Sequence, residues 1–263
     1  KYYVKINAHE GESAVMEFTT EDATQLPNSD METWEVTATG DKYLGGGPFW
    51  ERWEVAGWAT YNPMTTGNTG TRDHTAYVNR SGTAQSADKH GGSYAAELRT
   101  IGWGAGNSAT SSISADNPKY ITKGMLYLGT SPTRYSEMDI EIQKGILFES
   151  RPVSISFFCK YVKKNNADYG EMTIWLQDAA GNTIASGHQG NLDSDGYTKV
   201  TVPLAYVENP AKAAKIYVEF SSSGHPDWDT RSKDWFEVPR FSNLRDGKFQ
   251  GSSLFIDDIV LNY

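Results

Sequence analysis

Hydrophobic and polar residues alternate with a period of two in several stretches of the C-terminal half of the chain. The clearest examples cover residues 153–162, 171–177, 197–204 and 215–220. This alternation predicts β-strands with one buried face. Shorter strand-forming stretches occur at residues 93–101, 125–128 and 138–142. Because many short strands are separated by turn signals and no helical period is present, we expect an all-β antiparallel β-sandwich, or jelly roll.

The last stretch, residues 251–263, combines strand-forming apolar residues with two adjacent acidic ones, Asp257 and Asp258. Two neighbouring carboxylates in a buried strand are costly unless other groups compensate their charge. We therefore expect this strand to complete a sheet and its carboxylates to have specific partners.

The N-terminal part differs from the rest of the chain. Residues 2–6 and 14–18 alternate and flank a turn at 9–13, a pattern that predicts a hairpin. Residues 19–27 resemble a linker. We expect an N-terminal strand segment with linker at 1–25 and a jelly-roll domain at 26–263.

Composition narrows the class of protein. The net charge is -9, and the chain contains 8 Trp, 15 Tyr and 10 Phe. An acidic chain is a poor match for nucleic acid, which requires clustered Lys and Arg. No apolar run is long enough for a transmembrane segment. The single cysteine, Cys159, has no partner for an internal disulfide and is expected to pack as a small apolar residue.

The alternation also predicts which side chains point away from the core. These residues pair an aromatic ring with hydrogen-bonding groups, and they are Trp175, Tyr217, Glu219, Gln177 and Lys160. Sugars present apolar C–H faces and polar rims, so an aromatic platform beside carboxylate, amide and ammonium groups suits them. The alternative is that the long polar stretches cover this face and make it a second core.

Further tryptophans lie in Gly-, Pro- or charge-rich stretches expected to be loops. Trp103, Trp228 and Trp235 could line a ligand site near the sheet, since exposed apolar surface often marks a contact. The alternative is that each anchors its own loop.

Catalytic motifs are absent from the sequence. There is no Gly-x-Ser-x-Gly elbow, zinc signature or phosphate loop. A glycosidase needs two carboxylates at one bond, and 33 Asp and Glu residues do not single out a pair. We therefore name no catalytic residue and expect a binding protein rather than an enzyme.

Five segments, in order, resemble a known family. The sequence NSDMETW at 28–34 is similar to the "NSDFExW" opening of the putative carbohydrate metabolism domain, a family of Bacteroidetes surface and secreted proteins, with Met31 replacing the aromatic residue. The other segments that resemble this family lie at 89–98, 124–129, 151–161 and, as its ending, 221–224 with 251–261. The resemblance covers roughly residues 26–263.

This resemblance implies a jelly roll like those of carbohydrate-binding modules. It also implies an exported protein of the outer-membrane surface or periplasm, with a lipid anchor in the full-length precursor. Such jelly rolls often hold a structural calcium. The matching ligands here would be Glu32, the backbone near 89–92, and Asp257, and hard oxygen ligands suit Ca²⁺. The alternative is that both carboxylates accept hydrogen bonds from loop amides without a metal.

The function predicted from these features is non-catalytic binding of a polysaccharide or other glycan at a bacterial cell surface, in polysaccharide utilisation. Two alternatives remain open. One is a glycoside hydrolase or lyase acting on polysaccharide, and the other is a structural or adhesive surface module.

Overall fold

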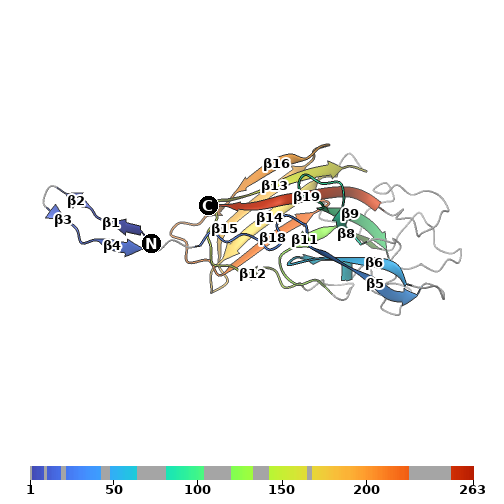
Figure 1. Ribbon diagram of the computed structural model, residues 1–263, viewed down its shortest axis with the longest axis horizontal. Helices are drawn as coiled ribbons and strands as arrows, with labels where there is room; N and C mark the ends of the chain where they lie inside the picture. Colours follow the sequence, from blue (N-terminus) through green and yellow to red (C-terminus); the bar gives the residue numbers. More distant parts are fainter. Residues whose placement is uncertain are drawn as a thin grey trace.

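The computed structural model describes residues 2–8, 11–18, 22–42, 48–63, 81–103, 120–132, 142–164, 168–224 and 250–263. Within these ranges the chain forms an antiparallel sandwich of two sheets with an N-terminal hairpin to one side (Figure 1). The predicted all-β sandwich is confirmed. In the described ranges, no helix is both long and apolar enough to cross a membrane.

The first sheet follows the order β10-β9-β19-β13-β16, and β8 also pairs with β9. Its strands are β8 (Thr83–Ser86), β9 (Ala95–Trp103), β10 (Tyr120–Thr122), β13 (Ser154–Val162), β16 (Thr198–Pro203) and β19 (Gln250–Asn262). The C-terminal strand β19 lies between β9 and β13 and pairs antiparallel with both. The prediction that the last strand completes a sheet is confirmed.

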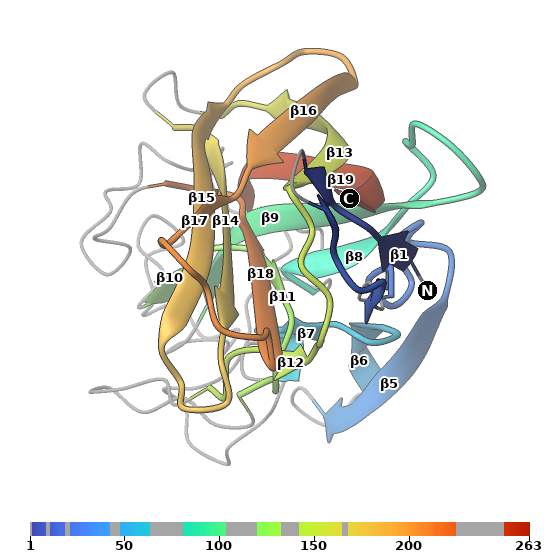
Figure 2. The same cartoon turned by 90° about the vertical axis from the view of Figure 1, so that its left-hand side faces the viewer.

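The second sheet follows the order β17-β15-β14-β18-β11-β7, and β12 also pairs with β18. Its strands are β7 (Ala59–Thr60), β11 (Met125–Tyr127), β12 (Ile146–Leu147), β14 (Gly170–Gln177), β15 (Thr183–Leu192), β17 (Ala205–Tyr206) and β18 (Lys215–Ser221). Figure 2 shows this sheet facing the first one across the core.

A separate pair, β5 (Trp34–Lys42) with β6 (Pro48–Val55), lies in a stretch for which the sequence pattern names no strand. Trp53 is therefore a strand residue, and its ring meets that of Trp34 edge to face. Charged residues are interspersed here with the aromatic ones without a period of two, so the sequence pattern did not reveal these strands.

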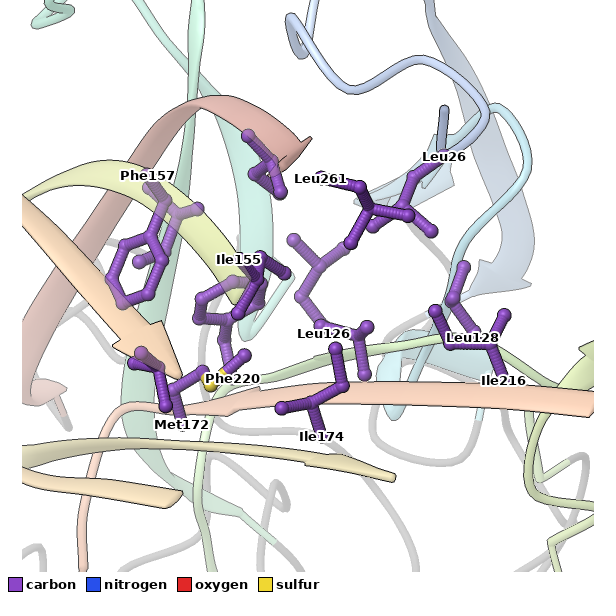
Figure 3. Packing of buried hydrophobic residues seen from close by; sticks show 14 of the residues in the cluster. Leu26, Leu126, Leu128, Ile155, Phe157, Met172, Ile174, Ile216, Phe220 and Leu261 are labelled. Atoms are coloured by element: carbon purple, nitrogen blue, oxygen red, sulfur yellow. The ribbon is translucent and has the colours of Figure 1, made fainter. Parts of the chain in front are cut away.

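The core lies between the two sheets and is built from the inward residues that the alternation predicted. Ile155, Phe157, Met172, Ile174 and Phe220 are all fully buried and pack together (Figure 3). Each such side chain contributes about 1.5–3 kcal/mol to the free energy of unfolding. Cys159 is also buried in this core, as predicted.

The N-terminal hairpin forms as predicted. β1 (Tyr2–Val4) pairs with β4 (Met16–Phe18), and β2 (Asn7–Ala8) pairs with β3 (Gly11–Glu12). Residues 22–25, which the sequence pattern assigns to this segment, instead contact the sandwich. The Gln25 side chain exchanges two hydrogen bonds with the backbone of Leu261, and the Ser150 hydroxyl donates to the carbonyl of Asp22.

Candidate functional site

The outer face of the second sheet carries a regular array of aromatic and polar side chains. Across β14 and β18 the outward residues pair as Thr173 with Glu219, Trp175 with Tyr217, and Gln177 with Lys215. Their neighbours along each strand lie in the core, so these six point away from it. On the other side of β14, strand β15 places Ser186 opposite Trp175 and His188 opposite Thr173.

Trp175 stacks on Tyr217, with ring centroids 5.0 Å apart and planes at 26°. Tyr217 is 1 % exposed, whereas Trp175 is half-buried. On the neighbouring strands, Tyr127 lies 6.3 Å from Tyr217, and Tyr61 lies 5.9 Å from Tyr127 between ring centroids. Together with Ala59 and Met125, these rings form a second apolar cluster on this face.

Tyr217, predicted as a ligand contact, is thus buried, and its contact with a ligand stays a prediction. Its ring is covered by Trp175 and by other side chains of the second apolar cluster, which agrees with the alternative of a second core. Trp175 is half-buried beside it. The stacking contact with Tyr217 orients the indole, so the exposed part of Trp175 is the candidate platform.

Glu219 is the acidic group beside this platform. The Tyr217 hydroxyl donates a hydrogen bond to Glu219 Oε2, and Lys144 Nζ lies 3.9 Å from that carboxylate and 5.0 Å from the Tyr217 ring centroid. Burial is the main cause that raises the pKa of Tyr217 well above its usual range, and the negative charge of Glu219 is the second cause. Burial likewise raises the pKa of Tyr61 to about 12. Tyr217 thus stays a hydrogen-bond donor, and the carboxylate retains lone pairs for a ligand hydroxyl.

Polar groups surround the indole on its other sides. Gln177 and Thr173 are half-buried on β14, while Ser186 and His188 are exposed on β15. Thr173 Oγ1 lies 3.1 Å from His188 Nδ1, which orients both groups. The β15 residues escaped sequence prediction because β15 is rich in Gly, Ser, Gln and Asn and lacks a strand-like alternation.

Lys160 lies elsewhere. It belongs to β13 in the first sheet, so its outward side chain is on the opposite face of the sandwich. There it forms an ion pair with Asp88 and lies over the rings of Phe255 and Tyr197, at 4.5 and 5.7 Å from their centroids. The prediction that the outward sides of all these strands form one face is wrong, because β13 and β14 are in different sheets.

The remaining predicted ligand residues are tryptophans of the long polar stretches. Trp103 is the last residue of β9, where its backbone pairs with Tyr120, and its side chain lies outside the described part. Trp228 and Trp235 also lie outside the described residues. Their role in ligand binding stays a prediction.

Glu32 and Asp257 both bind the segment that joins β8 to β9. The amides of Ser93 and Tyr94 donate to Glu32 Oε1, at 2.6 and 3.0 Å. The amides of His90 and Gly91 donate to Asp257 Oδ2, at 2.8 and 3.0 Å.

The next residue, Asp258, contacts the same segment. It has a positive φ of 47°, at a position where the pairing of β19 with β13 shifts register. Its Oδ2 lies 2.7 Å from His90 Nδ1. This β-bulge turns two successive carboxylates toward one segment, which explains how the final strand accommodates both.

The two predicted calcium ligands have pKa shifts in opposite directions. The hydrogen bond from the Tyr94 amide is the main cause that lowers the pKa of Glu32. Burial raises the pKa of Asp257, and the amides of Gly91 and His90 partly oppose this effect.

Backbone amides already supply donors to Glu32 Oε1 and to both oxygens of Asp257. Among the described residues, no group of three or more His, Cys, Asp or Glu side chains is arranged to hold a metal. The observed contacts are those of the amide-bonded alternative, and the calcium version stays a prediction.

Comparison with known proteins supports the fold. No family model and no curated protein matches the chain. A structure described as a "putative glycoside hydrolase" from Bacteroides vulgatus aligns with a TM-score of 0.56 and 13 % identity, over 93 % of this chain and 99 % of that one. A second structure with the same description, from Bacteroides thetaiotaomicron, gives 0.51 and 16 %, over 87 % and 70 %.

A structure described as family 16 carbohydrate-binding module-2 aligns with a TM-score of 0.36 and 10 % identity, over 69 % of this chain and 86 % of that one. The two Bacteroides structures share the fold of this chain. At this level of identity the similarity shows the fold and not the function.

Proposed function

We propose that this protein binds a glycan without cleaving it, through the outer face of the second sheet around Trp175. The observation that carries the proposal is the accessible indole stacked on the buried Tyr217. A buried stack fixes the orientation of the indole, so little rotamer freedom is lost when a ligand binds.

The polar groups around the indole match the periphery of a sugar ring. Glu219 and Gln177 offer acceptors, Gln177 and Lys144 offer donors, and Ser186 and His188 line the exposed side. A pyranose can place its C–H face on the indole while its hydroxyls reach these groups. A single site of this kind gives a Kd on the order of micromolar to millimolar, about -4 to -8 kcal/mol.

We further propose that binding takes place at a bacterial cell surface, on an exported and lipid-anchored protein. The sequence resemblance to the putative carbohydrate metabolism domain supports this location. The shared fold with two proteins of Bacteroides species is consistent with it.

The proposal is tested by a glycan array at high protein concentration, followed by calorimetry with each glycan that binds. Trp175→Ala should weaken binding at least about tenfold, which is 1.4 kcal/mol. The matched control is Phe158→Ala, because Phe158 is a half-buried aromatic on the outer face of the opposite sheet. Absence of binding to any glycan, or equal losses in both variants, would contradict the proposal.

The enzyme alternative is distinguished by the same set of glycans. The two Bacteroides structures carry the description "putative glycoside hydrolase", and Glu219 is an acidic group within the candidate site. A hydrolase would release reducing ends from a bound polysaccharide, and Glu219→Gln would abolish that release. Binding without release favours the proposed function.

A further inference from the structure

A second polar site lies where the chain enters β14 and leaves β18. Asp168 is 1 % exposed, and the three serines Ser221, Ser222 and Ser223 are fully buried. The Gly224 amide donates to the carbonyl of Tyr169 at 2.8 Å, which holds the two segments together. This group is separate from Trp175, and the proposed function does not use it.

The two oxygens of Asp168 are in different situations. Oδ1 accepts hydrogen bonds from the Ser223 hydroxyl at 2.5 Å and from the Tyr169 amide at 3.1 Å. Oδ2 is buried and has no hydrogen-bond partner in the described part of the chain. No ion pair joins Asp168 to a cationic side chain among the described residues. A buried carboxylate that has no ion pair and one oxygen without a hydrogen bond is energetically costly, so another charge or a proton is expected to compensate it.

The surrounding groups favour a cation over another hydrogen bond. The Ser223 hydroxyl proton is used by Asp168 Oδ1, and the Ser221 hydroxyl donates to the carbonyl of Ser223 at 2.9 Å. Both hydroxyl protons are thus engaged elsewhere, and neither serves Asp168 Oδ2. A buried carboxylate oxygen without a donor suits a hard cation such as Ca²⁺.

We propose that Asp168 binds a hard cation of the Ca²⁺ class at the junction of residues 168–170 with 221–224. The cation would ligate Oδ2. This position differs from that of Glu32 and Asp257, where amides already meet the carboxylates. Here an oxygen lacks a partner, and the cation would complete the contacts of a buried charge.

Thermal unfolding of chelator-treated protein with and without added Ca²⁺ tests the proposal. Ca²⁺ should raise the Tm of the wild type and of Glu32→Gln and Asp257→Asn, but not that of Asp168→Asn. Tb³⁺ is a second probe, because it replaces Ca²⁺ and emits when nearby aromatic residues are excited. Its emission should be lost in Asp168→Asn and displaced by excess Ca²⁺ in the wild type.

The Asp168→Asn substitution also tests, in the absence of metal, whether the buried charge of Asp168 lowers stability. Asn retains an acceptor for the Ser223 hydroxyl and removes the charge, so metal-free Asp168→Asn should melt above the metal-free wild type. Three results would overturn the proposal: no response of the wild type to either ion, an equal response of Asp168→Asn, or a response lost in Glu32→Gln and Asp257→Asn instead. Because no glycan is involved, failure here is independent of failure at Trp175.

Discussion

The ring of Trp175 stacks on that of Tyr217, and the first ring of this pair is half-buried whereas the second is fully buried. The two residues oppose each other on neighbouring strands of the second sheet. We therefore expect their roles to differ: Tyr217 contributes to stability, and Trp175 offers the exposed surface of the pair.

Substitution of each ring should separate these roles. Tyr217→Ala should lower the free energy of unfolding by about 3–5 kcal/mol, as for other large buried aromatics. Trp175→Ala should cost less stability because the indole is half-buried, while it reduces glycan binding directly. Urea unfolding together with calorimetric titration measures both. Equal destabilisation by the two substitutions would show that Trp175 is a core residue rather than a platform.

The hydroxyl of Tyr217 offers a finer test. Tyr217→Phe keeps the ring and removes the hydrogen bond to Glu219, so we expect a loss of about 1.5–3 kcal/mol, typical of a hydrogen bond to a charged group. The loss should be smaller in a Glu219→Gln background, because the acceptor is then neutral. A double-mutant cycle from urea unfolding measures this coupling. Independent, additive effects would contradict the hydrogen bond.

Glycine at position 92 is required by both conformation and space. Gly92 has a φ of +51°, and an added Cβ would collide with the Glu32 carboxylate. The φ alone costs a non-glycine residue about 1–2 kcal/mol, and displacement of Glu32 from the Ser93 and Tyr94 amides adds to this. Gly92→Ala should therefore lower the free energy of unfolding by more than the matched control Gly181→Ala, whose φ is +86° in open space. Equal losses would mean that Glu32 moves aside freely.

The contacts of Glu32 predict a particular pH dependence. Its folded pKa is lowered from 4.5, so the ionised form adds stability that is fully present above about pH 4.5 and is lost as the pH falls through the lowered value. Glu32→Gln should lower the Tm at pH 7, and its difference from wild type should shrink toward pH 3. The exposed Glu149→Gln is the control for net charge. A difference that is constant over this range would exclude an ionised Glu32 as the cause.

The ionised form of Asp257 affects the free energy of unfolding in the direction opposite to that of Glu32. Its pKa is raised from 3.8, chiefly by burial, so its ionised form opposes stability above the raised value and this cost disappears as the pH falls. The Asp257 contribution thus partly masks that of Glu32 in the wild type. Comparison of each variant with wild type isolates the two contributions.

Cys159 should be unreactive in the folded protein. Burial raises the pKa of its thiol to about 11, so the thiolate is scarce and shielded at neutral pH. A thiol reagent such as DTNB should react with it only after denaturation. Rapid reaction of the native thiol would show that the core opens near β13.

The core and most of its strands were predictable from the sequence because their alternation is regular. The inward residues of β13, β14 and β18 are those that the pattern names, and all are buried. Strands β5, β6 and β15 were missed, since charged, glycine or amide residues replace the apolar positions that make a strand recognisable.

The site was predictable in part. Alternation along β14 and β18 places Trp175, Glu219 and Gln177 outward, which is a local property of each strand. It cannot say which sheet a strand joins, so Lys160 was grouped with residues on the opposite face. Nor can it show that Tyr217 is buried, since this depends on side chains from β11 and β7, far away in the sequence.

The position of β19 also sets the order in which the first sheet can form during synthesis. Until residues 250–262 have been translated, β9 and β13 each lack the neighbour that separates them, and both present unpaired backbone edges. The segment between β8 and β9 has no Asp257 to accept its amides during the same period. Between the translation of residue 162 and that of residue 250, the growing polypeptide therefore carries both unpaired edges, and molecules whose synthesis stops in this interval retain them. For this topology, protection of the nascent chain from intermolecular strand pairing depends on β19.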